Sequence, residues 1–482
     1  MLNSKLLQII SSLSDKEFKD FEKYLYTCVE SNSNVGLLFQ LIKNHYPSFD
    51  EAKLDKKNIY AQIFGKGAYK DVKVREIMSL LRKQCENFLI NIELNHTEYY
   101  KQLALLKQFR KRKLPVLFNQ QLKTVENQLE EDAYLNAEKH KRLYLLANEK
   151  NNFFEQHQIR AHDSSISEKN ENFDKYFFSS KLQTICELIN REKILSASYN
   201  KSLEEEVLSI IDKHKNFYLD IPAVHCYYEI ILLLKSSNDE EQFVKSFNTL
   251  NKYQKSFKER ELKSMFSYLL NYCIDQVNSG FVHFTKRLFD MQKLLLQNRI
   301  LLEDGVLSHI SYRNIVSIAI KLKEYEWAEK FIEDYKTYVS ELHQENAYSL
   351  SKSNLLYAQE NFSETVLLLN QIEFTDVYYA CTAKFTLLKA YFALKEWETL
   401  DYFVSSFQLY LKRNKDIALN FKKSSENFLK HFKKLLLVHK QLDFKEEKKM
   451  EKKLQDLKKN IEEEGIIANK TWLLEELDKI KL

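Results

Sequence analysis

The chain has 482 residues, of which only 6 are glycine and 3 are proline. Average usage would supply roughly 7% glycine and 5% proline, so the residues of tight hairpin turns are scarce and an all-β or doubly wound fold is disfavoured. The 73 basic and 68 acidic side chains leave a formal net charge of +5, spread along the chain, which is no nucleic-acid footprint by itself. With 44% hydrophobic and 13% aromatic residues, the composition predicts an all-α protein.

Simple sequence patterns argue against a membrane span, an enzyme, and a metal or cofactor site. The start of the chain has no signal-peptide pattern, and no run of about 18 uncharged apolar residues occurs. No CxxC, HExxH or EF-hand spacing is present, and the few glycines leave no nucleotide-binding loop or nucleophile elbow. We therefore expect a cytoplasmic, non-enzymatic protein without metal or cofactor. The six cysteines, which stand far apart in apolar helical contexts, are interpreted as reduced core residues: Cys28, Cys85, Cys186, Cys226, Cys273 and Cys381.

Residues 1–100 are predicted to form a helical N-terminal unit. Ser14 and Glu17 have the spacing of a capping box, and Leu13 can pack on Phe18 as a hydrophobic staple. The apolar spacing of three and four that follows predicts one amphipathic helix. Further helices are expected over 35–46, from after residue 50 to 64, and over 71–100.

Residues 101–200 are predicted to form a connecting region of long helices. A basic cluster at 110–113 lies just before Pro115, which suits the first turn of a helix, so the cations are expected at the end of the preceding helix. Helices are expected over 115–128 and 132–160. The stretch 162–170 has no apolar period and is predicted to be a loop.

Residues 201–412 are predicted to be an array of helical hairpins. Tyr325, Phe362 and Trp397 are separated by 37 and 35 residues, and each lies between two apolar helical segments. This period resembles that of the tetratricopeptide repeat. The small residue expected three positions after each aromatic is Ala328, Thr365 or Leu400, so the repeats resemble the family in degenerate form. The resemblance implies a right-handed α-α superhelix, or solenoid, in which each hairpin buries its apolar face on its neighbours.

Residues 413–482 are predicted to be C-terminal helices. Met450, Leu454, Leu457 and Ile461 form a short coiled-coil-like stripe, which is too short for an independent coiled coil and is expected to pack on the array. After Asn469, a final helix carrying Trp472 is expected to cap the array or to dock on a partner.

The function predicted from this architecture is a non-enzymatic scaffold or adaptor that binds a protein or peptide partner in a groove of the array. The groove residues are those that the repeat register projects from the first helix of each hairpin. They are Arg313, Ser317, Asn354, Tyr357, Phe385 and Lys389, of which Ser317, Asn354 and Lys389 occupy equivalent positions.

An alternative function is DNA-binding regulation through the N-terminal unit, with the array as a sensor. The segment 54–64, the glycine turn at 65–67 and the helix after it resemble the helix-turn-helix part of winged-helix domains in some bacterial transcriptional activators, although no β-wing is visible. That resemblance implies phosphate contacts from the cations Lys70, Lys73, Arg75, Arg82 and Lys83. The N-terminal pattern and the segment 181–191 also resemble a family of uncharacterised all-helical bacterial proteins, which implies only helical architecture.

Overall fold

The computed structural model of the chain describes residues 4–49, 54–65, 67–96, 98–157, 163–195, 198–374, 376–415, 417–441 and 447–480. Over these residues the chain forms 24 α-helices and one antiparallel pair of two-residue strands, β1 (Leu302–Glu303) and β2 (Val306–Leu307). The predicted all-α class is confirmed. Among the described helices, none combines the length and the apolar character that crossing a bilayer requires.

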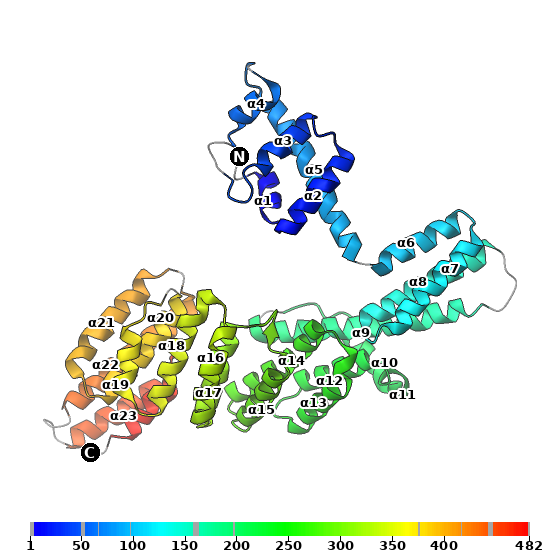
Figure 1. Cartoon of the computed structure of the whole chain (residues 1–482). Helices are drawn as coiled ribbons and strands as arrows, with labels where there is room; N and C mark the ends of the chain where they lie inside the picture. Colours follow the sequence, from blue (N-terminus) through cyan, green and yellow to red (C-terminus); the bar gives the residue numbers. More distant parts are fainter. Residues whose placement is uncertain are drawn as a thin grey trace. The chain divides into compact units, whose positions relative to one another are not determined.

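The chain divides into two compact units. Unit 1 comprises residues 1–133 and 137–177, and unit 2 comprises residues 134–136 and 178–482. The helices of unit 1 are α1 (Lys5–Ser11), α2 (Asp15–Cys28), α3 (Asn34–Lys43), α4 (Lys56–Phe64), α5 (Asp71–His96), α6 (Glu98–Lys111), α7 (Pro115–Glu131), α8 (Ala137–Gln156) and the first part of α9 (Ser165–Leu195) (Figure 1). This division differs from the sequence-based boundaries at residues 100, 200 and 412.

Local sequence signals place the helices of unit 1. The capping box is confirmed, because Ser14 accepts from the amide of Glu17 and the Glu17 carboxylate accepts from the amide of Ser14 at 2.8 Å. Leu13 and Phe18 are both buried in the core that α1 to α5 share. Pro115 is the first residue of α7, as predicted.

The predicted loop over 162–170 is wrong from residue 165 onward, where α9 begins. The Asp163 carboxylate accepts from the amide of Ser165 at 2.9 Å, and the Ser164 hydroxyl donates to the Glu168 carboxylate at 3.0 Å. A polar segment of this kind can start a helix, because the Asp163 side chain accepts from a backbone donor of the first turn and Ser164 holds the Glu168 side chain beside it. Residue 162 lies outside the described residues.

Unit 2 consists of helices that pack as consecutive hairpins (Figure 1). After the remainder of α9 come α10 (Glu204–Lys213), α11 (Lys215–Tyr218), α12 (Pro222–Lys235), α13 (Glu240–Tyr253), the 3₁₀ helix η1 (Gln254–Ser256), α14 (Glu259–Asn278) and α15 (Phe284–Gln297). The segment with the clearest sequence period follows as α16 (His309–Lys321), α17 (Tyr325–Tyr335), η2 (Lys336–Tyr338), α18 (Glu341–Ala358), α19 (Phe362–Asn370), α20 (Val377–Ala393) and α21 (Trp397–Arg413). The first helices α16, α18 and α20 pack in sequence against one another.

The three periodic turns share one backbone geometry. Lys323, Glu360 and Lys395 each adopt a left-handed conformation, with φ of 60°, 64° and 60°. In each turn the next residue's N–H donates to the carbonyl five residues earlier, at 2.9 to 3.0 Å, as in a Schellman motif. The aromatic residue that defined the period is then the first residue of the second helix.

The chain's last described helices are α22 (Leu419–Gln441), α23 (Glu447–Glu463) and α24 (Lys470–Asp478). The predicted stripe packs on the array, because Met450, Leu457 and Ile461 are buried in one cluster with residues of α20, α21 and α22, such as Leu388 and Phe407. Trp472 of α24 packs against the same cluster.

Candidate functional site

The predicted groove residues of α16, and Asn354 near the end of α18, lie on a partly open surface. Ser317 is exposed, and Arg313 is half-buried. The guanidinium carbon of Arg313 lies 4.3 Å from the centre of the Tyr379 ring, within the range of a cation–π contact. Asn354 accepts a hydrogen bond from Thr386 of α20 at 3.0 Å. Side chains of three consecutive first helices therefore meet on this face.

A cluster that the sequence analysis missed lies at the N-terminal ends of the same helices. His309 Nδ1 is 2.7 Å from the hydroxyl oxygen of Tyr379, and the His309 ring stacks on His343 with ring centres 4.1 Å apart. Together with Arg313 these residues form what we call the His309 cluster. His343 does not lie at the position that the repeat register pairs with His309, so the register gave no signal for this cluster.

The electrostatics of the His309 cluster favour the binding of a negatively charged group. Burial lowers the pKa of His309, and the neighbouring His343 and Arg313 lower it further, against the opposing effect of Asp376. Among the described residues no carboxylate forms an ion pair with Arg313; its partner is the Tyr379 ring. A half-buried guanidinium on an aromatic face can bind a carboxylate through two parallel hydrogen bonds.

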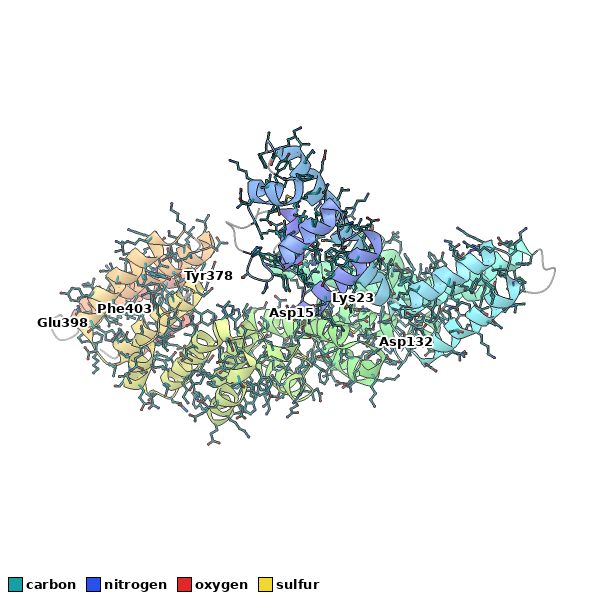
Figure 2. The ribbon with its side chains drawn as sticks, turned by 45° about the horizontal axis from the view of Figure 1, so that its top comes forward. Asp15, Lys23, Asp132, Tyr378, Glu398 and Phe403 are labelled. Carbon is teal, nitrogen blue, oxygen red and sulfur yellow. The ribbon has the colours of Figure 1, made fainter. Side chains whose placement is uncertain are left out.

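An exposed apolar row borders the His309 cluster. Ile310, Leu342 and Tyr378 are each the second residue of their helix, in α16, α18 and α20, and their exposed fractions are 56%, 79% and 39%. Figure 2 labels Tyr378. Exposed apolar side chains at the starts of three helices form a surface that can bury apolar side chains of a partner.

The other predicted groove residues are covered by the C-terminal segment of the chain. The Trp472 indole N–H donates to the Tyr357 hydroxyl at 3.1 Å, and Lys389 donates to Asn469 at 2.5 Å while lying 5.6 Å from the Trp472 ring centre. Phe385 is only 6% exposed. These three residues do not form an open groove. Asn469 and Trp472 contact Lys389 and Tyr357, and the Phe385 ring packs on Phe407 of α21 and Phe428 of α22.

The cover also changes the chemistry of Lys389. Burial lowers the pKa of its ammonium group to about 8, with Glu475 opposing the effect. Because Asn469 and Trp472 contact this ammonium group, Lys389 is not available to bind a partner.

The cations of the alternative, DNA-binding prediction do not share one face. Arg75 forms an ion pair with Asp71, and Lys73 lies 5.2 Å from the centre of the Phe64 ring. Arg75 and Arg82 share a side of α5, whereas Lys73 and Lys83 fall on other sides at about 100° per residue. Lys70 precedes the helix. The described residues of unit 1 contain no strand, and hence no β-wing.

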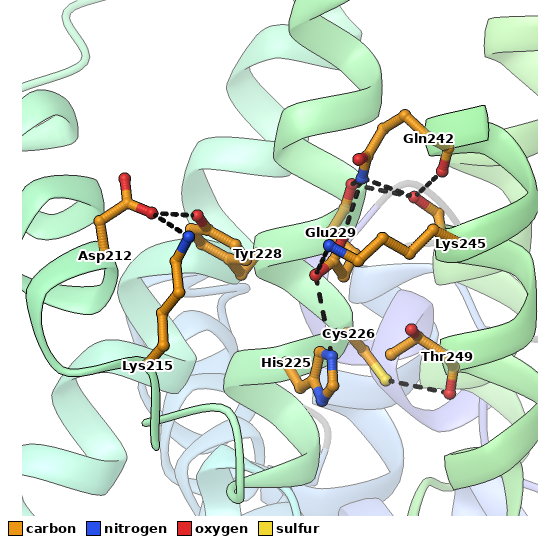
Figure 3. Close-up of polar contacts among 10 residues, drawn as sticks. Asp212, Lys215, His225, Cys226, Tyr228, Glu229, Gln242, Lys245 and Thr249 are labelled. Atoms are coloured by element: carbon orange, nitrogen blue, oxygen red, sulfur yellow. Dashed lines mark hydrogen bonds and ion pairs between the residues drawn. The ribbon is translucent and has the colours of Figure 1, made fainter. Parts of the chain in front are cut away.

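The one carboxylate of α12 belongs to a polar network within one hairpin (Figure 3). Glu229 is completely buried, accepts from Gln242 at 2.8 Å, and lies 3.1 Å from the Lys245 ammonium group and 3.8 Å from His225 Nε2. Burial lowers the pKa of His225, and Glu229 opposes that effect. Every one of these partners is on α12 or α13, so the network joins the two helices.

Cysteine and metal chemistry add no further site. In the part of the chain that the structure describes, no three His, Cys, Asp or Glu side chains stand close enough to share a metal ion. The six cysteines are free thiols. Five are buried as predicted, but Cys28, at the end of α2, is exposed, so its expected core position is wrong. Burial raises the pKa of the Cys85 and Cys273 thiols to about 12.

Comparison with known proteins does not extend this description. No protein-family model, no curated protein and no solved structure matches the chain.

Proposed function

We propose that the chain is a non-enzymatic scaffold or adaptor that binds a protein or peptide segment across α16, α18 and α20. In this proposal the hairpins of unit 2 form a right-handed tetratricopeptide-like superhelix. The shared turn geometry at Lys323, Glu360 and Lys395 supports it, because equal turns place successive hairpins in equivalent ways. Free, mostly buried thiols support a reducing compartment, so we place the protein in the cytoplasm.

The observation that carries the proposal is the Arg313 guanidinium. It is half-buried on a face to which three first helices contribute, and no carboxylate of the described chain pairs with it. Desolvating a cation without an anionic partner costs free energy, which a bound carboxylate would recover. The apolar row at Ile310, Leu342 and Tyr378 lies on the same helix ends. The fitting partner is therefore a segment that carries both an acidic and an apolar side chain.

A peptide-display selection tests this function, because random peptides can reveal the binding preference of the face directly. Random peptides are selected on the full-length protein, and their affinities are then measured for Arg313→Glu, Leu342→Glu and the control Lys330→Glu. Lys330 is exposed on the second helix α17, so its variant makes the same change of charge as Arg313→Glu away from the proposed face.

We expect peptides with acidic and apolar residues, and at least roughly tenfold weaker binding to Arg313→Glu and Leu342→Glu, because each loses a contact of more than about 1.4 kcal/mol. Lys330→Glu should bind like the wild type. Peptides that bind Arg313→Glu and Leu342→Glu with wild-type affinity would show that this face is not the binding site.

A further inference from the structure

A surface cavity in unit 1 gathers cations from three helices. Lys5 of α1, Lys56 of α4, and Arg75 and Arg82 of α5 line a cavity of about 270 Å³. Leu6 and Met78 form an apolar part of its wall, and both are buried in the core of the unit. The lining of the cavity is therefore partly cationic and partly apolar.

The sequence explains why these side chains converge. Arg75, Met78 and Arg82 recur at spacings of three and four residues, so they share one face of α5. Lys5 and Lys56 are the first residues of α1 and α4, which both pack against α5. Three elements far apart in sequence thus direct cations to one point.

The carboxylates nearby neutralise only part of this charge. Asp71 pairs with both Lys56, at 3.1 Å, and Arg75, at 2.5 Å. Glu86 lies 3.3 Å from Arg82 Nε. Among the described residues no carboxylate pairs with Lys5, so two carboxylates face four cations, and neither carboxylate lines the cavity.

The Arg82 guanidinium also has an unused donor. Its Nε is buried and makes no hydrogen bond, since the contact with Glu86 does not have the geometry of one. A buried donor without an acceptor costs free energy of about 1 to 3 kcal/mol. An anion in the cavity would supply acceptor oxygens as well as the missing negative charge.

We propose that this cavity binds the phosphate group of a small phosphate monoester, whose organic part rests on Leu6 and Met78. A monoester dianion matches the two uncompensated positive charges, and its three terminal oxygens suit both guanidinium and ammonium donors. At about 30 Å³ for each water, the cavity holds more than a bare ion. A nucleic-acid backbone fits less well, because it needs cations along a track and these converge on one point.

Titration calorimetry with phenyl phosphate tests the proposal, because this probe joins a monoester dianion to an apolar ring. Phenol is the matched probe without phosphate, inorganic phosphate is the probe without the ring, and an oligonucleotide without terminal phosphates presents only phosphodiesters. The full-length protein is compared with Lys5→Glu, Arg82→Gln and the control Lys23→Glu. Lys23, labelled in Figure 2, is exposed on α2 and does not line the cavity.

We expect phenyl phosphate to bind more tightly than inorganic phosphate, and phenol not to bind. Lys5→Glu and Arg82→Gln should each weaken phenyl phosphate binding at least roughly tenfold, with Lys23→Glu unchanged. Lys5 is an exposed side chain, so its variant keeps the test valid even if Arg82→Gln perturbs the fold. Three outcomes overturn the proposal: no phenyl phosphate binding at about 10 mM, equal binding by wild type and Lys5→Glu, or tighter binding of the oligonucleotide than of phenyl phosphate.

Discussion

His140 on α8 is a buried titratable side chain whose protonation should control the acid stability of unit 1. Burial lowers its pKa to about 4, and the ammonium groups of Lys175 and Lys139 act in the same direction. In the unfolded chain His140 has an ordinary histidine pKa of about 6.5, so between pH 6.5 and pH 4 the unfolded chain binds a proton that the native state does not. The contribution of neutral His140 to stability is therefore retained above pH 6.5 and is lost as the pH falls towards 4.

His140→Leu should remove this dependence. Between pH 7 and pH 5 the wild type should lose about 2 kcal/mol more unfolding free energy than the variant, as follows from the two pKa values of His140. Urea unfolding at both pH values measures the difference. His214→Leu, at an exposed position, controls for the loss of a histidine as such. If the wild-type and His140→Leu curves move in parallel with pH, His140 is not the responsible group.

At the scale of single elements, the helix ends show how this chain turns with so few glycines. Lys323, Glu360 and Lys395 hold the left-handed position that glycine usually occupies in a Schellman motif. For residues with a Cβ atom that conformation costs about 1 kcal/mol or more. The turns are kept by the packing of the helices on either side.

Lys323→Gly should therefore stabilise the protein, by about 1 kcal/mol, because glycine relieves the left-handed strain. Lys321→Gly is the matched control, since Lys321 is an exposed lysine two residues earlier and is the last residue of α16. There glycine relieves no left-handed strain and should destabilise, by less than the about 1 kcal/mol of a helix interior. Thermal unfolding of the two variants compares the effects. If both variants shift the unfolding temperature in the same direction by the same amount, the left-handed conformation assigned to Lys323 is contradicted.

These turns also mark what the sequence predicts and what it does not. The scarcity of glycine correctly predicts helices, and the aromatics at 325, 362 and 397 correctly mark where second helices begin. The left-handed residue two positions before each aromatic carries no signal, because lysine and glutamate have no preference for that conformation. Tertiary packing of the flanking helices fixes the left-handed conformation at these positions.

The candidate site is predictable to a similar extent. Repeat register alone places Arg313, Ser317 and Asn354 on one surface. It does not predict that Lys389 is covered, because its contact with Asn469, 80 positions further along the chain, depends on how the chain between them folds back. The cavity at Lys5 and Arg82 is also invisible in the sequence, since its cations come from three separated helices.

At the scale of the whole chain, each of the two compact units buries hydrophobic clusters of its own. Phe118 of α7 stacks on Phe153 of α8 in unit 1, with ring centres 4.1 Å apart. In unit 2, Trp472 packs with Phe392, Phe428 and Phe432. A chain whose two units bury separate hydrophobic clusters is not expected to unfold as one two-state system.

Scanning calorimetry should therefore resolve two transitions, and each can be assigned by an aromatic truncation. Trp472→Ala should lower only the transition of unit 2, by roughly 5 °C, since losing a packed aromatic ring costs about 3 kcal/mol. Phe118→Ala should lower only the other transition. Thr471→Ala, at the exposed neighbour of Trp472, should leave both in place. If the two aromatic variants lower the same transition, the cores unfold together, and the stability of each unit depends on the other.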